Sequence, residues 1–191
     1  MKNKKYLPLK IVHSIFIVVG IVLYAITLIS FNQGASALNI VSTSLNIAAL
    51  IAATIYLMFG YKKNAQLSYK IAIWLIVIAE IIECTTIFSM GVAMPPFAAF
   101  RKVIALVVVV LLAGANDYGV VKSNVLSLAL VALNIYLVIS VIVNMSSSSL
   151  AAMGLPSEVV FFDAIGRLVI ASTLALMVCG KYLDKESRGA K

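Results

Sequence analysis

The chain has 191 residues, of which 63% are hydrophobic and only 12% are charged, and its mean hydropathy is +1.10. This balance excludes an ordinary soluble domain and indicates a protein embedded in a membrane. No polar stretch between the apolar runs reaches the roughly 50 residues that a separate domain needs. We therefore expect a single transmembrane domain over residues 1–191.

Apolar runs of about 20 residues, the length that crosses a bilayer as an α-helix, follow one another along the chain. The segments between them are rich in Gly, Pro, Ser and Asn, which end helices and form loops. The pattern predicts an all-α bundle of about six spans. Their expected positions are near residues 11–31, 36–59, 70–92, 99–116, 124–145 and 159–180.

The first run could be read as a secretory signal, because "MKNKKYLPLK" precedes it and Ala35-Ser36-Ala37 follows it. Its apolar part is longer than the roughly 7–15 residues that a signal peptide uses. We expect an uncleaved first span, with cleavage as the alternative.

The second run carries two patterns that suit contacts between helices. Asn39, Thr43 and Asn46 recur at helical spacing and share one face. Small residues form a ridge that permits close approach of another helix, either from this chain or from a partner subunit. These residues are Ala48, Ala49, Ala52 and Ala53.

The third run, "IAIWLIVIAEIIECTTIF", contains two carboxylates. Counted from Lys70 at ~1.5 Å per residue, Glu80 is ~15 Å and Glu83 ~20 Å inside the span. Their spacing of three places both on one face of the helix. Because a carboxylate that faces lipid is costly, this face is expected to point into the bundle.

The remaining runs supply partners for these acids. Arg167, on the last run, is ~21 Å from the end marked by Lys181, close to the level of Glu83, and Asp163 is one turn away from it. Arg101 and Lys102 open the fourth run, and on the fifth run Tyr136, Ser140 and Asn144 share a face. We predict a charged cluster in the outer half of the bundle, with Asn39 and Asn144 extending it into a polar pocket. Its expected members are Glu80, Glu83, Asp163, Arg167 and Arg101.

The basic residues are distributed unevenly between the two expected sides of the membrane. With six spans, 12 of the 15 lie on the side that holds both termini, and only Arg101, Lys102 and Arg167 do not. By the positive-inside rule, both termini are predicted to be cytoplasmic. The net charge of +8 then reflects anchoring to anionic lipid, and no nucleic-acid partner is expected.

Enzyme, metal and cofactor signatures are missing from the sequence. It contains none of the usual protease, hydrolase, dinucleotide or phosphate-loop motifs. His13 is the only histidine, and Cys84 and Cys179 lie on different runs. We therefore expect a non-enzymatic protein without metal or cofactor, integral to a bacterial plasma membrane.

Two functions stay open at this point. In the first, the protein is a small transport or solute-binding component that takes a small solute, a proton or a cation into the polar pocket. In the second, it is a structural or regulatory membrane subunit whose buried charges only fix helix packing.

Overall fold

The computed structural model describes residues 7–31, 37–59, 63–89, 96–114, 120–144 and 157–189, and all of these residues are helical. The bundle contains, in chain order, α1 (Leu7–Phe31), α2 (Ala37–Phe59), α3 (Lys63–Ser89), α4 (Pro96–Gly114), α5 (Val120–Asn144) and α7 (Ser157–Gly189). Each expected span overlaps one of these helices, so the all-helical prediction is confirmed for the described part of the chain.

Four of the described helices have segments long and apolar enough to cross a membrane, which makes the fold compatible with an integral membrane protein. These segments are Pro8–Ser30, Ala37–Met58, Asn124–Val143 and Val160–Val178, in α1, α2, α5 and α7. The α3 helix is more charged, because Lys70, Glu80 and Glu83 interrupt its apolar sequence. That α3 and α4 also cross the membrane stays a prediction.

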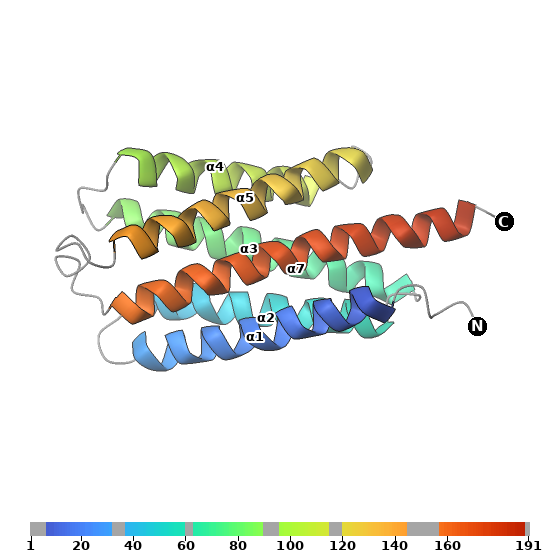
Figure 1. The fold of residues 1–191 in the computed structure, drawn as a ribbon, viewed down its shortest axis with the longest axis horizontal. Helices are drawn as coiled ribbons and strands as arrows, with labels where there is room; N and C mark the ends of the chain where they lie inside the picture. Colours follow the sequence, from blue (N-terminus) through green and yellow to red (C-terminus); the bar gives the residue numbers. More distant parts are fainter. Residues whose placement is uncertain are drawn as a thin grey trace.

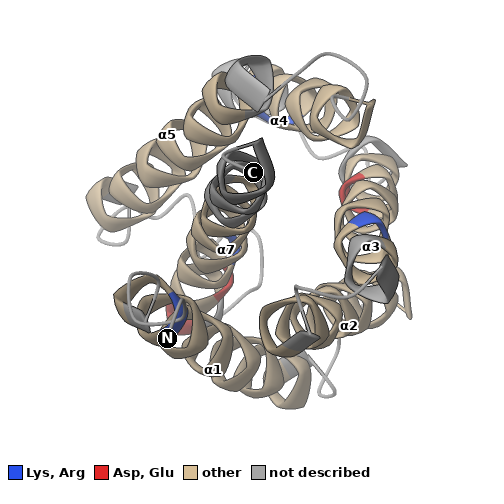
Figure 2. Cartoon of the chain, turned by 90° about the vertical axis from the view of Figure 1, so that its right-hand side faces the viewer, with Lys and Arg blue, Asp and Glu red and all other residues tan. Residues whose placement is uncertain are grey.

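Among the described helices, α1 to α5 form an open arc around α7 (Figure 2). In the end-on view, α1 to α5 follow one another around the arc, and α7 lies inside it (Figure 2). The α7 backbone packs closely against α1 and α5 and touches α2, whereas α3 and α4 reach it mainly through side chains. The last helix of the chain is therefore the central one.

The helices run antiparallel from one to the next, as Figure 1 shows. The first turn of α1 and the last turn of α7 consequently lie at the same end of the bundle (Figure 1). Which side of a membrane this end faces stays a prediction.

Small residues bring the backbones together where α1, α2 and α7 meet. A Cβ on Gly20 would lie 2.8 Å from Leu50 Cδ1 and 2.9 Å from Val169 Cγ1, so a larger residue there would require these side chains of α2 and α7 to shift. In α2, Ala49, Ala52 and Ala53 are buried, and Ala48 is half-buried. The close approach that this ridge permits is therefore made largely within the chain itself.

Candidate functional site

An ion-pair cluster of five side chains joins α3, α4 and α7. Its members are Glu80, Glu83, Lys102, Asp163 and Arg167. The sequence places these residues far apart, and the antiparallel packing of the helices brings them to one level. In the end-on view, α3 and α7 each carry acidic and basic segments (Figure 2).

Arg167 is the centre of this cluster. Its Nε donates to Asp163 Oδ2 at 2.7 Å, one turn earlier on the same helix. Its Nη1 forms an ion pair with Glu83 and lies 3.5 Å from Glu80 Oε1 across the gap to α3. This ion pair confirms the predicted pairing of Glu83 with Arg167. The prediction was possible because helical rise places both residues at the same depth.

Lys102 of α4 completes the cluster and takes the place that the sequence predicts for Arg101. Its Nζ lies 2.7 Å from Glu80 Oε2 and 2.5 Å from Glu83 Oε2, and the residue is only 2% exposed. Arg101, the predicted member, is half-buried and forms no ion pair with any described residue. Neighbouring positions on a helix differ by about 100° in direction, so only one of the two can face the acids.

The apolar pattern of α4 does not distinguish Lys102 from Arg101. Ala105, Val109 and Leu112 follow Lys102 at helical spacing, and all three are buried. Arg101 lies at the other edge of the same buried face, because Ala105, Val108 and Leu112 follow it four, seven and eleven positions later. Extending the apolar face back to the start of the helix therefore leaves both cations as candidates.

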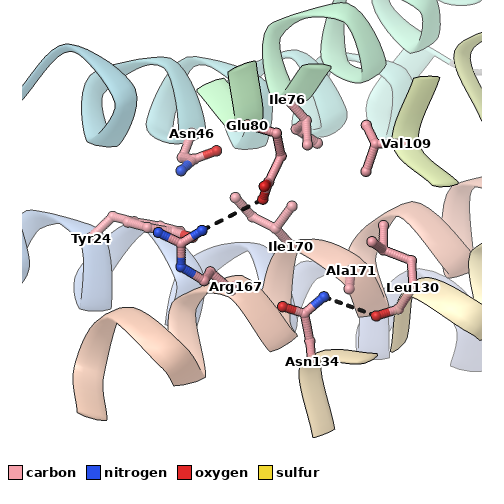
Figure 3. A pocket seen from close by; sticks show the side chains of 10 residues that line it. All are labelled: Tyr24, Asn46, Ile76, Glu80, Val109, Leu130, Asn134, Arg167, Ile170 and Ala171. Carbon is pink, nitrogen blue, oxygen red and sulfur yellow. Dashed lines mark hydrogen bonds and ion pairs between the residues drawn. The ribbon is translucent and has the colours of Figure 1, made fainter. Parts of the chain in front are cut away.

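Beside the cluster lies a small cavity that all six described helices line (Figure 3). Its polar lining comes from Tyr24, Asn46, Glu80, Asn134 and Arg167, and its apolar lining from Ile76, Val109, Leu130, Ile170 and Ala171. The centre of a water molecule has about 10 Å³ to occupy there. This is close to the lower limit for one bound water, so the cavity has no room for an organic solute in this conformation.

The structure describes the side chain of only one of the two asparagines predicted to extend the cluster, Asn39 and Asn144. Asn39 is half-buried on α2 and does not line the cavity, whereas Asn46, from the same stripe, does. Asn144 ends α5, and its side chain lies outside the described residues.

On α5 the predicted inward stripe is partly wrong, because Tyr136 is 44% exposed. The buried polar residue is Asn134, whose Nδ2 donates to Leu130 O at 2.8 Å. Leu130 and Val138 are buried one turn to either side of Asn134, and this helical spacing of apolar residues was the signal for the inward face.

Among the described residues, no three His, Cys, Asp or Glu side chains are arranged to hold a metal ion. Cys84 is a free, buried cysteine on α3. The described side chains thus form paired charges next to a polar cavity the size of one water molecule. A site of this size can bind a proton, a water molecule or a very small ion.

Comparison with known proteins adds no assignment. The chain matches no protein-family model, no curated protein and no solved structure. The class that the fold and the cluster define is therefore a helical protein compatible with membrane integration, with a buried ion-pair network around its central helix.

Proposed function

We propose that this chain is a small multi-pass transport component of a bacterial plasma membrane, and that its ion-pair cluster binds and releases a proton. The observation that supports this most directly is the polar cavity at the cluster, which six helices line and which has room for one water molecule. A polar group in the interior of a membrane bundle is a candidate for an ion or proton pathway.

The charge balance of the cluster favours a proton over a metal cation. Three carboxylates share two directly paired cations, so the cluster can take up one proton without leaving a cation unpaired. The guanidinium of Arg167 lines the same cavity and repels other cations. Glu80 is the best candidate for the exchanging group, because it contacts both cations and also lines the cavity.

The test is proton flux into liposomes that contain the purified protein and a pH-sensitive dye. A potassium gradient with valinomycin supplies the membrane potential that drives the flux. We expect the internal pH to change faster than in protein-free liposomes, and we expect Glu80→Gln to remove most of this difference. Glu158→Gln is the matched control, since Glu158 is an exposed acid in the first turn of α7.

The transport proposal fails if the unaltered protein, folded by circular dichroism, moves protons no faster than protein-free liposomes. It also fails if Glu80→Gln and Glu158→Gln reduce the flux equally, because the flux would then not depend on the cluster.

A second function has its own support. Every charged side chain in the cluster has an ion-pair partner, as expected of a network that only holds helices in register. In that case the protein is a structural or regulatory subunit of a larger membrane assembly. Native mass spectrometry of the protein extracted gently from its own membrane distinguishes the two, since a subunit would be released together with its partner.

A further inference from the structure

The hydroxyl of Tyr24 is a buried polar group without a partner. The residue is 0% exposed in the middle of α1, and its Oη has no hydrogen-bond partner among the described residues. Thr27, one turn away on the same helix, satisfies its hydroxyl by donating to Leu23 O at 2.9 Å. A tyrosine ring is too long and rigid to bond to its own helix in this way, so its hydroxyl must find a partner elsewhere.

The ring of Tyr24 is held against α7. A Cβ on Gly166 would lie 3.0 Å from Tyr24 Cζ and 3.1 and 3.3 Å from its Cε atoms, so the ring lies directly on the glycine backbone. This contact keeps the hydroxyl end of the ring beside Arg167 at the edge of the central cavity (Figure 3). The hydroxyl therefore cannot rotate out of the cavity to reach a partner elsewhere.

The cavity that Tyr24 lines meets the requirements for a bound water. It has about 10 Å³ for the centre of a water molecule, and a buried water needs two to four polar partners. Besides Tyr24, the amides of Asn46 and Asn134 and the charged groups of Glu80 and Arg167 line it. Asn134 uses its Nδ2 within α5, and this leaves its Oδ1 able to accept a hydrogen bond from water.

A second cavity of similar size adjoins the first, with Ile76 and Ile170 in the walls of both. Thr173 is the only residue with a polar side chain among its lining residues, which otherwise are alanines and larger apolar residues such as Leu50, Leu174 and Met177. The Thr173 Oγ1 also has no hydrogen-bond partner among the described residues, but one hydroxyl is fewer than the two to four polar partners that a buried water needs, so this space is expected to stay dry. The pair of cavities thus provides an internal comparison between a polar and an apolar space.

We propose that the central cavity is a binding site for one water molecule, which links the Tyr24 hydroxyl to the ion-pair cluster, and that the adjoining cavity is dry. The water is then the group through which Glu80 exchanges its proton. That role rests on the proposed function, whereas the presence of the water does not.

Radiolytic labelling in ¹⁸O-enriched water tests the site in the full chain, held in lipid nanodiscs. X-rays split bound water into hydroxyl radicals, which oxidise the side chains beside it, and mass spectrometry locates the incorporated ¹⁸O. We expect Tyr24 to be labelled several-fold faster than Tyr69, which is 4% exposed and lines neither of the two cavities. Met177 is intrinsically reactive and 0% exposed, and because it lines only the second cavity we expect it to stay unlabelled.

A cavity-filling variant makes the test specific. Ala171→Val adds two methyl groups to the wall of the central cavity and should lower Tyr24 labelling to the level of Tyr69. Ala175→Val, one turn further along α7 and outside both linings, should leave it unchanged. If Ala171→Val does not fold, Asn46→Leu removes a polar partner of the water while keeping the number and branching of the side-chain heavy atoms, and serves the same purpose.

The proposal is overturned if Tyr24 in the unaltered protein is labelled no faster than Tyr69, or if filling the cavity leaves its labelling unchanged. Equal labelling of Tyr24 and Met177 would overturn the contrast between the two cavities. Labelling needs no proton gradient, so a labelled Tyr24 in a protein without flux would keep the water site and remove only the transport proposal.

Discussion

Two adjacent cations on α4 differ in burial and in ion pairing. Lys102 is enclosed between Glu80 and Glu83, whereas Arg101 beside it is half-buried without an ion pair to any residue that the structure describes. Lys102 thereby binds α4 to the acids of α3, and through them to Arg167 of α7. This bridge matters because α3 and α4 have few backbone contacts with the central helix.

We expect Lys102→Met to lower the free energy of unfolding by about 3–5 kcal/mol, because it leaves two carboxylates buried with one fewer cation. Arg101→Met should cost less than half as much. Unfolding in mixed SDS and non-ionic micelles, followed by circular dichroism, measures both. Equal losses for the two variants would contradict the assignment of Lys102 to the cluster.

The Glu83 and Arg167 pair can be tested by a double-mutant cycle with Glu83→Gln and Arg167→Gln. Both side chains share partners in the cluster, so their effects on the free energy of unfolding should not add. We expect a coupling of about 0.5–3 kcal/mol from the same unfolding measurement. Additive effects would mean that the two residues do not form the ion pair.

At the scale of the helices, the position of Arg167 relative to the acids of α3 depends on how closely α7 can approach α1. The contacts at Gly20 and Gly166 place the α1 and α7 backbones next to each other and set the ring of Tyr24 on α7. The same approach places Arg167 within reach of α3. Close packing at two glycines therefore determines the geometry of the charged site.

Gly20→Ala should destabilise the bundle by about 1–3 kcal/mol, because its Cβ would overlap Leu50 and Val169 and force helices apart. Gly114→Ala is the matched control, since a Cβ there meets nothing within 4 Å. Thermal unfolding of the two variants in detergent compares them. A Gly20→Ala protein as stable as Gly114→Ala would show that the contact is easily relaxed.

At the scale of the whole molecule, α1 begins and α7 ends at the same end of the bundle (Figure 1). Most of the basic residues lie in segments at that end according to the predicted topology, which favours a cytoplasmic location for both termini.

Fusions to the C-terminus test this orientation in a bacterial host. We expect a green fluorescent protein fused there to fluoresce and an alkaline phosphatase fused there to be inactive, because the first folds in the cytoplasm and the second requires export. An active phosphatase fusion would reverse the predicted orientation.

The sequence by itself determined the helical architecture and most of the cluster. Apolar runs near the length of a bilayer predict the helices, because backbone groups in lipid must be satisfied within each segment. Glu80, Glu83, Asp163 and Arg167 were found because charged residues inside apolar helices must face one another, and helical rise gives their relative depth.

Only the tertiary structure decided which side chains meet around α7. Lys102, Asn134 and Tyr24 came to the centre because the rotation of each helix about its axis is set by packing against its neighbours. One-dimensional periodicity fixes depth well but leaves that rotation open by a residue or two, which is enough to exchange Arg101 for Lys102. The water-sized cavity depends on all six helices at once, and no single segment of the sequence contains the information to predict it.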